Sequence, residues 1–306
     1  MNSAPGVSGY ASPAYAESLR EFGRPRLLSR SGGWLLERNI FTRGDRDGMG
    51  CYPLFSCVNW SGLVQDVDEI AGDLVAISVV TDPFGDYTEN ELRRAFPDVV
   101  RPFKEHLVTD LARGWLDGVS KHHRYYAERA LQRVAVEICP RPADMLDDWC
   151  DLYQALIERH ELRGIKAFSK YSFAGQLRVP GLVMFRAAEE GVIVGGHLWF
   201  VQGDVALSHL AAASARGYEL MVAYALYWFA LDYFASRVRW IDFGAGAGLR
   251  SKASDGLTRF KRGWTNDARM AYFCGRICDR QKYVELCQAS HCTDTAYFPA
   301  YRAGEF

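Results

Sequence analysis

The chain has 306 residues, a formal net charge of -1, and 49% apolar and 24% charged residues. This composition is ordinary for a folded protein with a full hydrophobic core. It excludes bulk attraction to nucleic acid or anionic lipid, so any phosphate must be bound by a local patch.

Residues 1–25 are predicted to form an unstructured N-terminal arm. The opening segment "MNSAPGVSGYASPAYAES" lacks the basic start and the apolar stretch of a signal peptide. The longest apolar run, Leu220–Ala235, contains Asp232 and is shorter than the ~20 residues that span a membrane. The sequence therefore predicts a soluble, cytoplasmic protein without membrane insertion.

Residues 26–165 are predicted to alternate strands and helices. Ser31-Gly32-Gly33 has the chemistry of a hairpin turn, and Asp73–Thr81 is a buried strand. The segments "RPFKEHLVTDL" and "RVAVEIC" are extended, with the helical "DGVSKHHRYYAERAL" between them. The stretch "PADMLDDWCDLYQALIERH" is an amphipathic helix, which Asp144 is expected to cap.

The pattern changes after residue 180. The segments "LVMFRAA", "GVIVGGHLWFVQ" and "DVALSHLAAAS" are predicted to be consecutive strands, and their short links indicate an antiparallel meander. A helix over 217–235, the strand "RVRWIDFG", the short helix "SDGLTRFKRGW" and the strand "ARMAYFCGRI" follow. One more helix, "DRQKYVELCQ", is predicted near the C-terminus.

The stretch "WIDFGAGAGLR" has an acidic residue and spaced glycines after a short apolar strand. Taken alone, it is similar to the nucleotide loop of a Rossmann-type methyltransferase, which follows the first strand of a doubly wound sheet. Here the loop comes near the end of the chain and after an antiparallel meander. We therefore expect a sharp strand-to-helix turn that needs glycine, and no binding of S-adenosylmethionine.

The element order after residue 181 and a motif within it resemble the Fem-type (FemAB-like) peptidyltransferases and the BioF2-like branch of the GNAT acyltransferase superfamily. That family has a strand ending in Asp-Phe-Gly, a glycine-bearing loop, and then Gly-Leu-x-x-Phe-Lys-x-x-aromatic. The matching residues are Asp242, Phe243, Gly244, Gly256, Leu257, Phe260, Lys261 and Trp264.

The resemblance implies an α+β fold with a GNAT-like mixed, mainly antiparallel sheet flanked by helices. It also implies two GNAT-like halves packed side by side. The first, divergent half would be residues 26–165, and the second, with the Phe-Lys motif, would be residues 166–306.

The resemblance places Lys261 near the reacting ester, where a fixed cation stabilises the oxyanion of amide formation. Asp242 is expected to orient Lys261 or an amine, or to hold the loop amides in an Asx-type turn. His209 lies on the third strand of the meander and is a candidate base for the attacking amine. A core histidine bonded to the backbone fits the sequence equally well. Asp110, at the end of an earlier strand, is a further candidate.

Basic residues cluster around the Phe-Lys motif: Arg250, Lys252, Arg259, Lys261, Arg262 and Arg269. Such a local surplus on a nearly neutral chain is typical of phosphate binding or of a solvated face. The residues expected to bind the donor or its phosphates are Arg216, Arg250, Lys252, Arg259, Phe260 and Arg262. Trp199, Tyr218 and Tyr224 are candidates for lining the acceptor cleft, and core packing accounts for them equally well.

The resemblance leaves two donors open. Enzymes that use acetyl-CoA present an Arg/Gln-x-x-Gly-x-Gly/Ala loop to the pyrophosphate, whereas "SARGYELM" keeps only Arg216 and Gly217. The interpretation is an aminoacyltransferase with no bound cofactor. It would move an aminoacyl group from the acceptor end of aminoacyl-tRNA to the amine of a peptide or small molecule, such as a cell-wall precursor or secondary metabolite. An acyl-CoA-dependent N-acyltransferase and a non-catalytic binding module on the same fold are the alternatives.

The chain has eight cysteines, and none forms a Cys-x-x-Cys pair. Cys274, Cys278, Cys287 and Cys292 lie near the C-terminus, but their spacing does not match a zinc site. Buried thiols in a reducing compartment and no metal site are the expectation, with a structural zinc site at these residues as the alternative.

Overall fold

The computed structural model describes residues 7–41, 44–246, 248, 255–265, 267–292 and 295–305. The chain divides into two compact units. Unit 1 comprises Met1–Gly9 and Lys104–Arg269, and unit 2 comprises Tyr10–Phe103 and Met270–Phe306.

This division differs from the predicted halves. The expected boundary at residues 165–166 falls within unit 1, and unit 2 is built from both ends of the chain. The cause is a long-range pairing between strands β4 (Ala76–Val80) and β11 (Asp267–Ile277). The two strands are antiparallel, with Phe273 opposite Val80. A single boundary in the sequence cannot define a unit whose paired strands come from both ends of the chain.

Unit 2 contains a sheet in the order β1-β2-β3-β4-β11. β3 and β4 pair in parallel, and the other neighbouring strands pair antiparallel. The predicted hairpin at Ser31-Gly32-Gly33 joins β1 to β2. The remaining elements of the unit are β1 (Arg24–Leu27), β2 (Trp34–Asn39), β3 (Arg46–Gly50), α1 (Pro13–Ser18), α2 (Leu63–Ile70), α3 (Glu89–Ala95) and α10 (Arg280–Ala289).

Residues 7–25 do not form the unstructured arm that the composition suggested. Ser12 caps helix α1 by accepting a hydrogen bond from the N–H of Ala14. Tyr15 and Ala16 on this helix are completely buried. The burial of these apolar side chains stabilises the segment against fraying.

Unit 1 contains a sheet in the order β5-β10-β9-β8-β7-β6. The predicted antiparallel meander is present, and β10 lies between β9, to which it is parallel, and β5, to which it is antiparallel. The predicted α+β class with a mixed, mainly antiparallel sheet is confirmed. The strands are β5 (Val99–Asp110), of which the part from Lys104 on belongs to this unit, β6 (Ala135–Ile138), β7 (Leu182–Glu189), β8 (Val192–Gln202), β9 (Val205–Ala213) and β10 (Trp240–Asp242).

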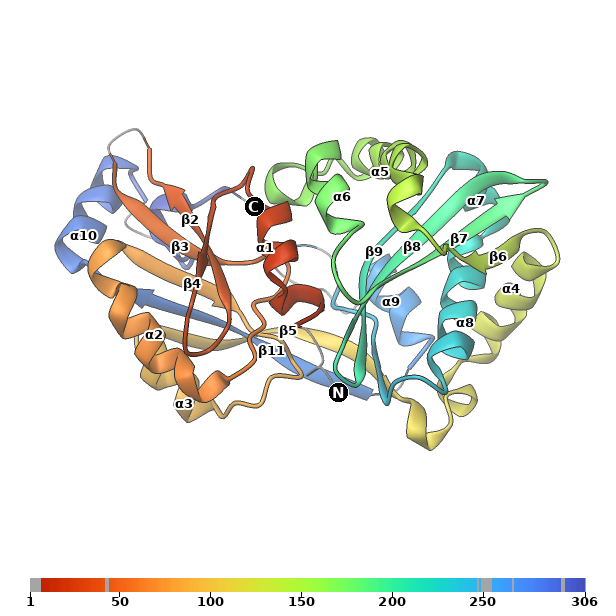
Figure 1. Ribbon diagram of the computed structural model, residues 1–306, viewed down its shortest axis with the longest axis horizontal. Helices are drawn as coiled ribbons and strands as arrows, with labels where there is room; N and C mark the ends of the chain where they lie inside the picture. Colours follow the sequence, from red (N-terminus) through yellow and green to blue (C-terminus); the bar gives the residue numbers. More distant parts are fainter. Residues whose placement is uncertain are drawn as a thin grey trace, which may run out of the picture. The chain divides into compact units, whose positions relative to one another are not determined.

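Helices cover both faces of the sheet in unit 1 (Figure 1). On one face, Trp149 of α5 packs against Gly196 of β8. Helix α8 lies on the other face, with α4 beside it. The helices are α4 (Lys121–Leu131), α5 (Leu146–His160), α6 (Lys170–Gln176), α7 (Ala215–Leu220), α8 (Val222–Phe234) and α9 (Gly256–Arg262).

Two helix predictions need correction. The expected helix over 217–235 is interrupted at Met221, whose φ of 60° lies in the left-handed region and separates α7 from α8. Asp144 does not cap α5, because Met145 takes the N-cap position and the Asp144 carboxylate pairs with Arg141 at 2.8 Å.

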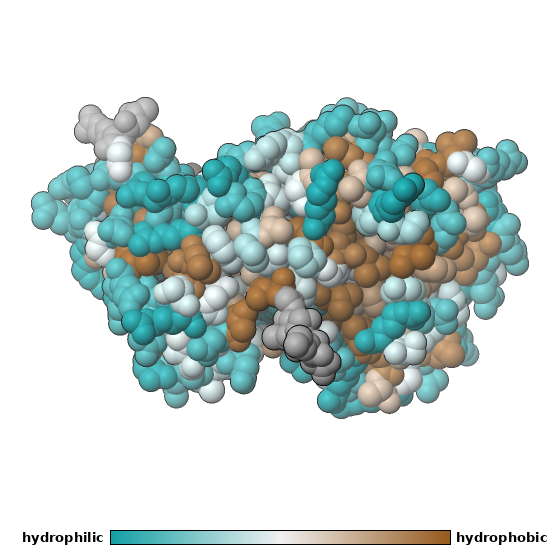
Figure 2. Space-filling view, viewed as in Figure 1, coloured by the Kyte–Doolittle hydropathy of each residue, from teal (hydrophilic) through white to brown (hydrophobic). Residues whose placement is uncertain are grey.

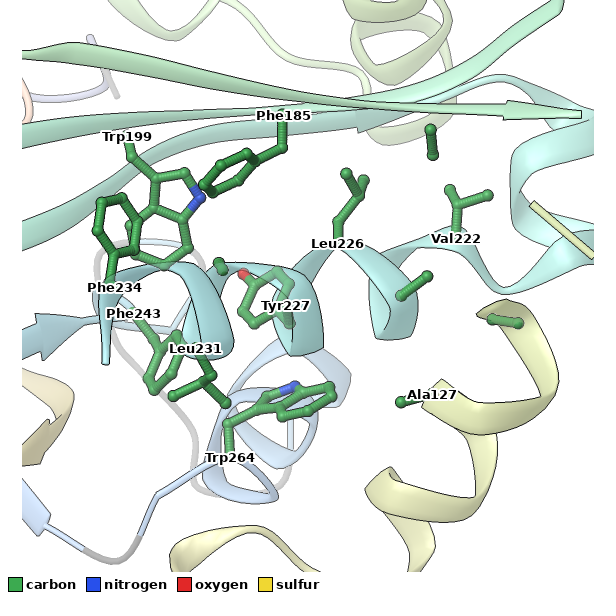
Figure 3. Packing of buried hydrophobic residues seen from close by; sticks show 14 of the residues in the cluster. Ala127, Phe185, Trp199, Val222, Leu226, Tyr227, Leu231, Phe234, Phe243 and Trp264 are labelled. Atoms are coloured by element: carbon green, nitrogen blue, oxygen red, sulfur yellow. The ribbon is translucent and has the colours of Figure 1, made fainter. Parts of the chain in front are cut away.

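Helix α8 is apolar on nearly every side because it is covered on nearly every side. Phe185 and Trp199 approach it from the sheet, and Phe243 and Trp264 lie on its other side (Figure 3). Tyr227 of α8 stacks 5.6 Å from Phe243 and 5.7 Å from Trp264. Burial of each such side chain contributes roughly 2–3 kcal/mol. This cluster therefore fixes the end of β10 and helix α9 against α8.

The face shown in Figure 2 is mainly hydrophilic, with apolar patches scattered among the polar side chains. Scattered apolar patches are normal on folded proteins. No helix in the described part of the chain has both the length and the apolar character needed to cross a membrane.

Candidate active site

The candidate site begins where β10 ends. After Asp242, the chain continues beside β5: Phe243 N donates to Leu107 O over 2.9 Å, and Leu107 N donates to Gly244 O over 3.2 Å. Gly244 has a φ of 77°, in the left-handed region that favours glycine. Its N–H donates to Oδ1 of Asp242 over 2.7 Å, which is the predicted Asx-type turn. The glycine at 244 thus makes a sharp turn.

Lys261 lies against this turn. Its helix α9 begins after Asp255, whose carboxylate accepts from the N–H and from the hydroxyl of Thr258 over 2.7 Å each. The Nζ of Lys261 donates to Ala245 O over 2.7 Å. A Cβ atom at position 244 would lie 3.2 Å from this Nζ. Glycine therefore also allows the ammonium group to approach the turn closely.

The environment of Lys261 is unusual for a lysine, since only 9% of the residue is exposed. Burial lowers its pKa to about 8, while Asp242 and Asp255 raise the pKa and Lys104 lowers it further. The hydrogen bond of this ammonium to Ala245 goes to a neutral carbonyl. A dehydrated cation with a neutral partner favours an anionic group nearby.

A second buried lysine, which the sequence analysis missed, reaches the same loop from β5. The Nζ of Lys104 donates to Gly246 O over 3.4 Å and also to Gly248 O. Burial lowers the pKa of Lys104, and the charge of Asp255 opposes this shift. Two ammonium groups thus bind carbonyls of one glycine-rich loop. The remaining residues of this loop, 247 and 249–254, lie outside the described part of the chain.

His106, two residues further along β5, is also part of the site and was also missed. Its Nδ1 lies 2.8 Å from Oδ2 of Asp242, and both residues are buried. Asp242 is paired with Val108 in the β10–β5 register, so the contact depends on strand pairing. The alternation in "FKEHLVTD" places Lys104 and His106 on one face of a strand, which was the available sequence signal.

His209 does not belong to this group of residues. Its Nε2 lies 3.0 Å from Oε1 of Gln176, and its ring lies 4.7 Å from that of Phe200. Burial lowers the pKa of His209 to about 3. A ring that stays neutral and is bonded to a buried amide is a core histidine. The structure therefore gives no support to His209 as the base.

The residues expected at a CoA pyrophosphate have other partners. Arg216 pairs with Glu189 and with Glu219, at 2.7 Å each. Gly217 is required for packing, because a Cβ atom there would lie 2.1 Å from Val194 O. The arginine and glycine of "SARGYELM" therefore serve ion pairs and packing within unit 1.

The remaining basic candidates are spread around α9. Arg259 is exposed. Arg262 is also exposed and lies 2.8 Å from Glu105. The predicted phosphate ligands Arg250 and Lys252 lie outside the described residues.

The aromatic candidates do not form one surface. Trp199 is completely buried beneath α8, so it does not line a cleft. Tyr218 is partly exposed, and the guanidinium of Arg159 lies 4.0 Å from its ring centroid. Tyr224 and Phe260 pack together with 5.0 Å between ring centroids. Of the predicted acceptor residues, Tyr224 is therefore the one that contacts α9.

Asp110 has a structural role. Its carboxylate accepts from Ala112 N over 3.1 Å and pairs with Arg239 at 3.4 Å. These contacts fix the turn after β5, at the other end of the β10 pairing from Asp242.

Cys274, Cys278 and Cys287 are free thiols that pack with apolar side chains. Burial raises the pKa of Cys274 to about 12 and that of Cys278 to about 11. Within the described ranges, no group of three or more His, Cys, Asp or Glu side chains is placed to hold a metal ion.

A hollow of about 640 Å³ in unit 2 is lined by several arginines. Their charges are neutralised locally: Arg24 and Arg46 pair with Glu37, and Arg302 pairs with Asp47. This hollow is an ion-pair network and shows no candidate for reaction chemistry.

Comparisons with known proteins identify solved structures that have a similar fold. No family model matches the sequence, and no curated protein matches it. FemX matches at 16% identity with a TM-score of 0.66, over 89% of this chain and 93% of that chain. The chain folds like FemX. This Fem-like fold is also similar to L-PGS from Bacillus licheniformis, at 12% identity and a TM-score of 0.59 over 93% and 97% of the two chains.

A third similar structure is the C-terminal domain (DUF2156) of a protein described as a lysylphosphatidylglycerol synthetase from Agrobacterium fabrum. It matches at 14% identity with a TM-score of 0.61, over 88% of each chain. The resemblance drawn from the Phe-Lys motif is therefore confirmed at the level of the fold. Identities this low show the fold alone.

Proposed function

We propose that the protein is an aminoacyltransferase that forms an amide bond. The observation that carries this proposal is the buried ammonium of Lys261 against the glycine turn after Asp242, in a Fem-like fold. A cation in a site with little water stabilises developing negative charge more strongly than it does in bulk water.

In the proposed reaction, the nitrogen of an acceptor amine attacks the carbonyl carbon of an aminoacyl ester. The carbonyl oxygen becomes an oxyanion, which Lys261 stabilises by roughly 3–4 kcal/mol, as a good oxyanion donor does. When the tetrahedral intermediate collapses, the carbon–oxygen bond to the ribose breaks. The ribose hydroxyl leaves with the proton that the amine has lost.

We favour aminoacyl-tRNA as the donor over acyl-CoA. The loop "SARGYELM" keeps only Arg216 and Gly217 of the CoA signature; Arg216 has two glutamate partners where Arg262 has one, and the backbone at Gly217 packs against Val194 O. Arg262 on α9 has an exposed ion pair with Glu105. Such pairs contribute only ~0–1 kcal/mol, so a tRNA phosphate can displace the glutamate. Charged tRNA is made in the cytoplasm, and the proposal places the protein there.

The acceptor in this proposal is the amine of a peptide or a small molecule, such as a cell-wall precursor or a secondary metabolite. Tyr224, packed on Phe260 of α9, is the residue that we propose contacts it.

The test is amide formation by the purified protein in a charging mixture of tRNA, amino acids, ATP and synthetases, with a pool of primary amines. We expect new amides by mass spectrometry and their loss after ribonuclease treatment. Lys261→Ala should lower the rate by about a hundredfold or more, while Lys261→Arg keeps a cation and should retain more activity. Lys282→Ala, which removes a lysine paired with Glu285, is the control and should keep the full rate.

Two results would replace this proposal with its alternatives. Turnover with acetyl-CoA that ribonuclease leaves unchanged would establish an acyl-CoA-dependent transferase. Binding of tRNA with no amide from either donor would establish a non-catalytic binding module.

A further inference from the structure

The pair formed by His106 and Asp242 has no role in the reaction as proposed so far. The imidazole Nδ1 lies 2.8 Å from Oδ2 of Asp242. The second oxygen of this carboxylate accepts from Gly244 N over 2.7 Å. Both oxygens of Asp242 are therefore engaged, and the carboxylate is fixed by backbone on one side and by the histidine on the other.

This arrangement selects one form of the histidine ring. A carboxylate can only accept a hydrogen bond, so the Nδ1 of His106 must carry the hydrogen. In the neutral ring, Nε2 then presents a lone pair. Within the described residues, Nδ1 is the ring nitrogen that has a hydrogen-bond partner and Nε2 has none. His106 is therefore a proton acceptor held in a defined orientation.

Other buried histidines of unit 1 differ from His106. The Nδ1 of His123 lies 2.8 Å from the hydroxyl of Ser120, and its Nε2 lies 2.8 Å from Phe260 O, so both nitrogens have partners. His209 is bonded to Gln176, and the Nε2 of His197 lies 2.8 Å from the hydroxyl of Ser208, so these two rings contact an amide and a hydroxyl where His106 contacts a carboxylate. In the described part of the unit, the pairing of a histidine with a carboxylate is found at the glycine turn.

We infer that His106 is the general base that accepts the proton of the acceptor amine, and that Asp242 is its positioning residue. This inference rests on the proposed amide-forming function. As the new carbon–nitrogen bond forms, the amine proton moves to Nε2. When the carbon–oxygen bond breaks, the same proton moves to the ribose oxygen. The ring is then neutral again, and no other reactant is consumed.

The surrounding charges fit this transfer. Asp242 bonds to His106 and raises the pKa of Lys261, so one carboxylate lies within the influence of both groups. The imidazolium that forms during the reaction gains this carboxylate as a partner, as in other histidine–carboxylate pairs. Among the described residues, Lys104 on β5 and Asp255 at the start of α9 also carry charge at the site. The substrate oxyanion beside Lys261 and the imidazolium of His106 beside Asp242 form in the same step.

The experiment compares variants in the charging mixture with the same pool of primary amines. His106→Gln should lower kcat by about a hundredfold, the size typical of a general base, with KM for tRNA changed less than about threefold. Asp242→Asn donates to Nδ1 and so stabilises the wrong tautomer, and it should cause a similar loss. His160→Gln, at an exposed histidine of α5, is the matched control. A kcat of His106→Gln within about threefold of wild type would overturn the inference.

A structural role is separated from a chemical one by rescue. Added imidazole should raise the rate of His106→Ala at least about tenfold over the rate without it, because imidazole replaces the missing base in the vacated space. A folded His106→Ala variant that imidazole does not rescue overturns the inference. If wild type forms no amide from either donor, the proposed function fails and the base role fails with it. If wild type is active and His106→Gln is equally active, only the base role fails.

Discussion

At the scale of the residue, two buried ammonium groups on one loop are the unusual feature of this protein. Removing an ammonium group from water is unfavourable, and a hydrogen bond to a carbonyl does not fully replace its hydration. Lys104 and Lys261 both show this in their lowered pKa values. A fold that retains such groups indicates a use for their charge, since perturbed groups concentrate at functional sites.

The lowered pKa of Lys261 predicts how activity depends on pH. The ammonium form is complete below about pH 8 and is lost as the pH rises through that value, so turnover should decline there. In Lys261→Arg the guanidinium stays charged, so the decline should move to higher pH. The check is the pH profile of kcat/KM for both proteins, corrected for uncatalysed hydrolysis of the ester. Identical alkaline limbs would contradict a role for Lys261 as the cation.

The same group predicts a pH-dependent contribution to stability. The pKa of Lys261 is about 8 in the folded protein and 10.5 ordinarily, so between these values the unfolded chain binds more protons. Burial of the Lys261 ammonium therefore lowers the unfolding free energy by its full amount below about pH 8, and this cost decreases as the pH rises. The unfolding free energy of wild type relative to Lys261→Met should increase by up to about 3 kcal/mol across this range. Urea titrations measure it, and a constant difference would show that Lys261 is solvated.

At the scale of the element, local patterns predicted most of unit 1. The meander, the strand before Asp242 and the short helix that carries Lys261 follow from alternation, turn residues and one motif. Asp255 begins α9 by accepting from Thr258 N, a local contact that sequence spacing can indicate. The break at Met221 could not be predicted in this way, because the left-handed conformation there has no glycine to mark it.

Asp255 has two roles: it caps α9, and its charge raises the pKa of Lys261. Asp255→Asn should keep the cap, since asparagine caps helices about as well as aspartate does. It removes the negative charge, so the alkaline limb of the activity profile should move to lower pH. Asp279→Asn, at the N-cap of α10, is the matched control and should leave the profile unchanged. A marked loss of melting temperature without a shift of the profile would show that Asp255 acts as a cap alone.

A substitution at Gly217, at the start of α7, can distinguish a packing role of this residue from a role in cofactor binding. Because an added Cβ would lie 2.1 Å from Val194 O, Gly217→Ala should destabilise the protein by roughly 1–3 kcal/mol. Gly72→Ala meets no atom within 4 Å and is the control. Both are measured by thermal unfolding. An alanine variant with wild-type stability but weakened binding of acetyl-CoA would instead support a CoA site.

At the scale of the whole molecule, the sequence could not predict what brings the site together. His106 and Asp242 are 136 positions apart, and they meet because β5 pairs with β10. The division into units depends in the same way on β11 pairing with β4. Such pairings are set by the global arrangement of strands, whereas periodicity and turn chemistry are local. The Phe-Lys motif pointed to Lys261 because motif residues lie close in sequence.

The charge of the whole molecule decides how the proposed donor should be bound. A formal net charge of -1 gives no long-range attraction to tRNA, so affinity must come from a few local phosphate contacts. Two or three such contacts predict that KM for tRNA rises by roughly 7- to 40-fold between about 50 and 200 mM salt. Arg262→Ala should reduce the slope of this dependence by about one, whereas Arg280→Ala, which breaks an ion pair with Asp98, should not. CoA is a small anion without the condensed counterions of a nucleic acid, so a shallow dependence that Arg262→Ala leaves unchanged would contradict tRNA as the donor.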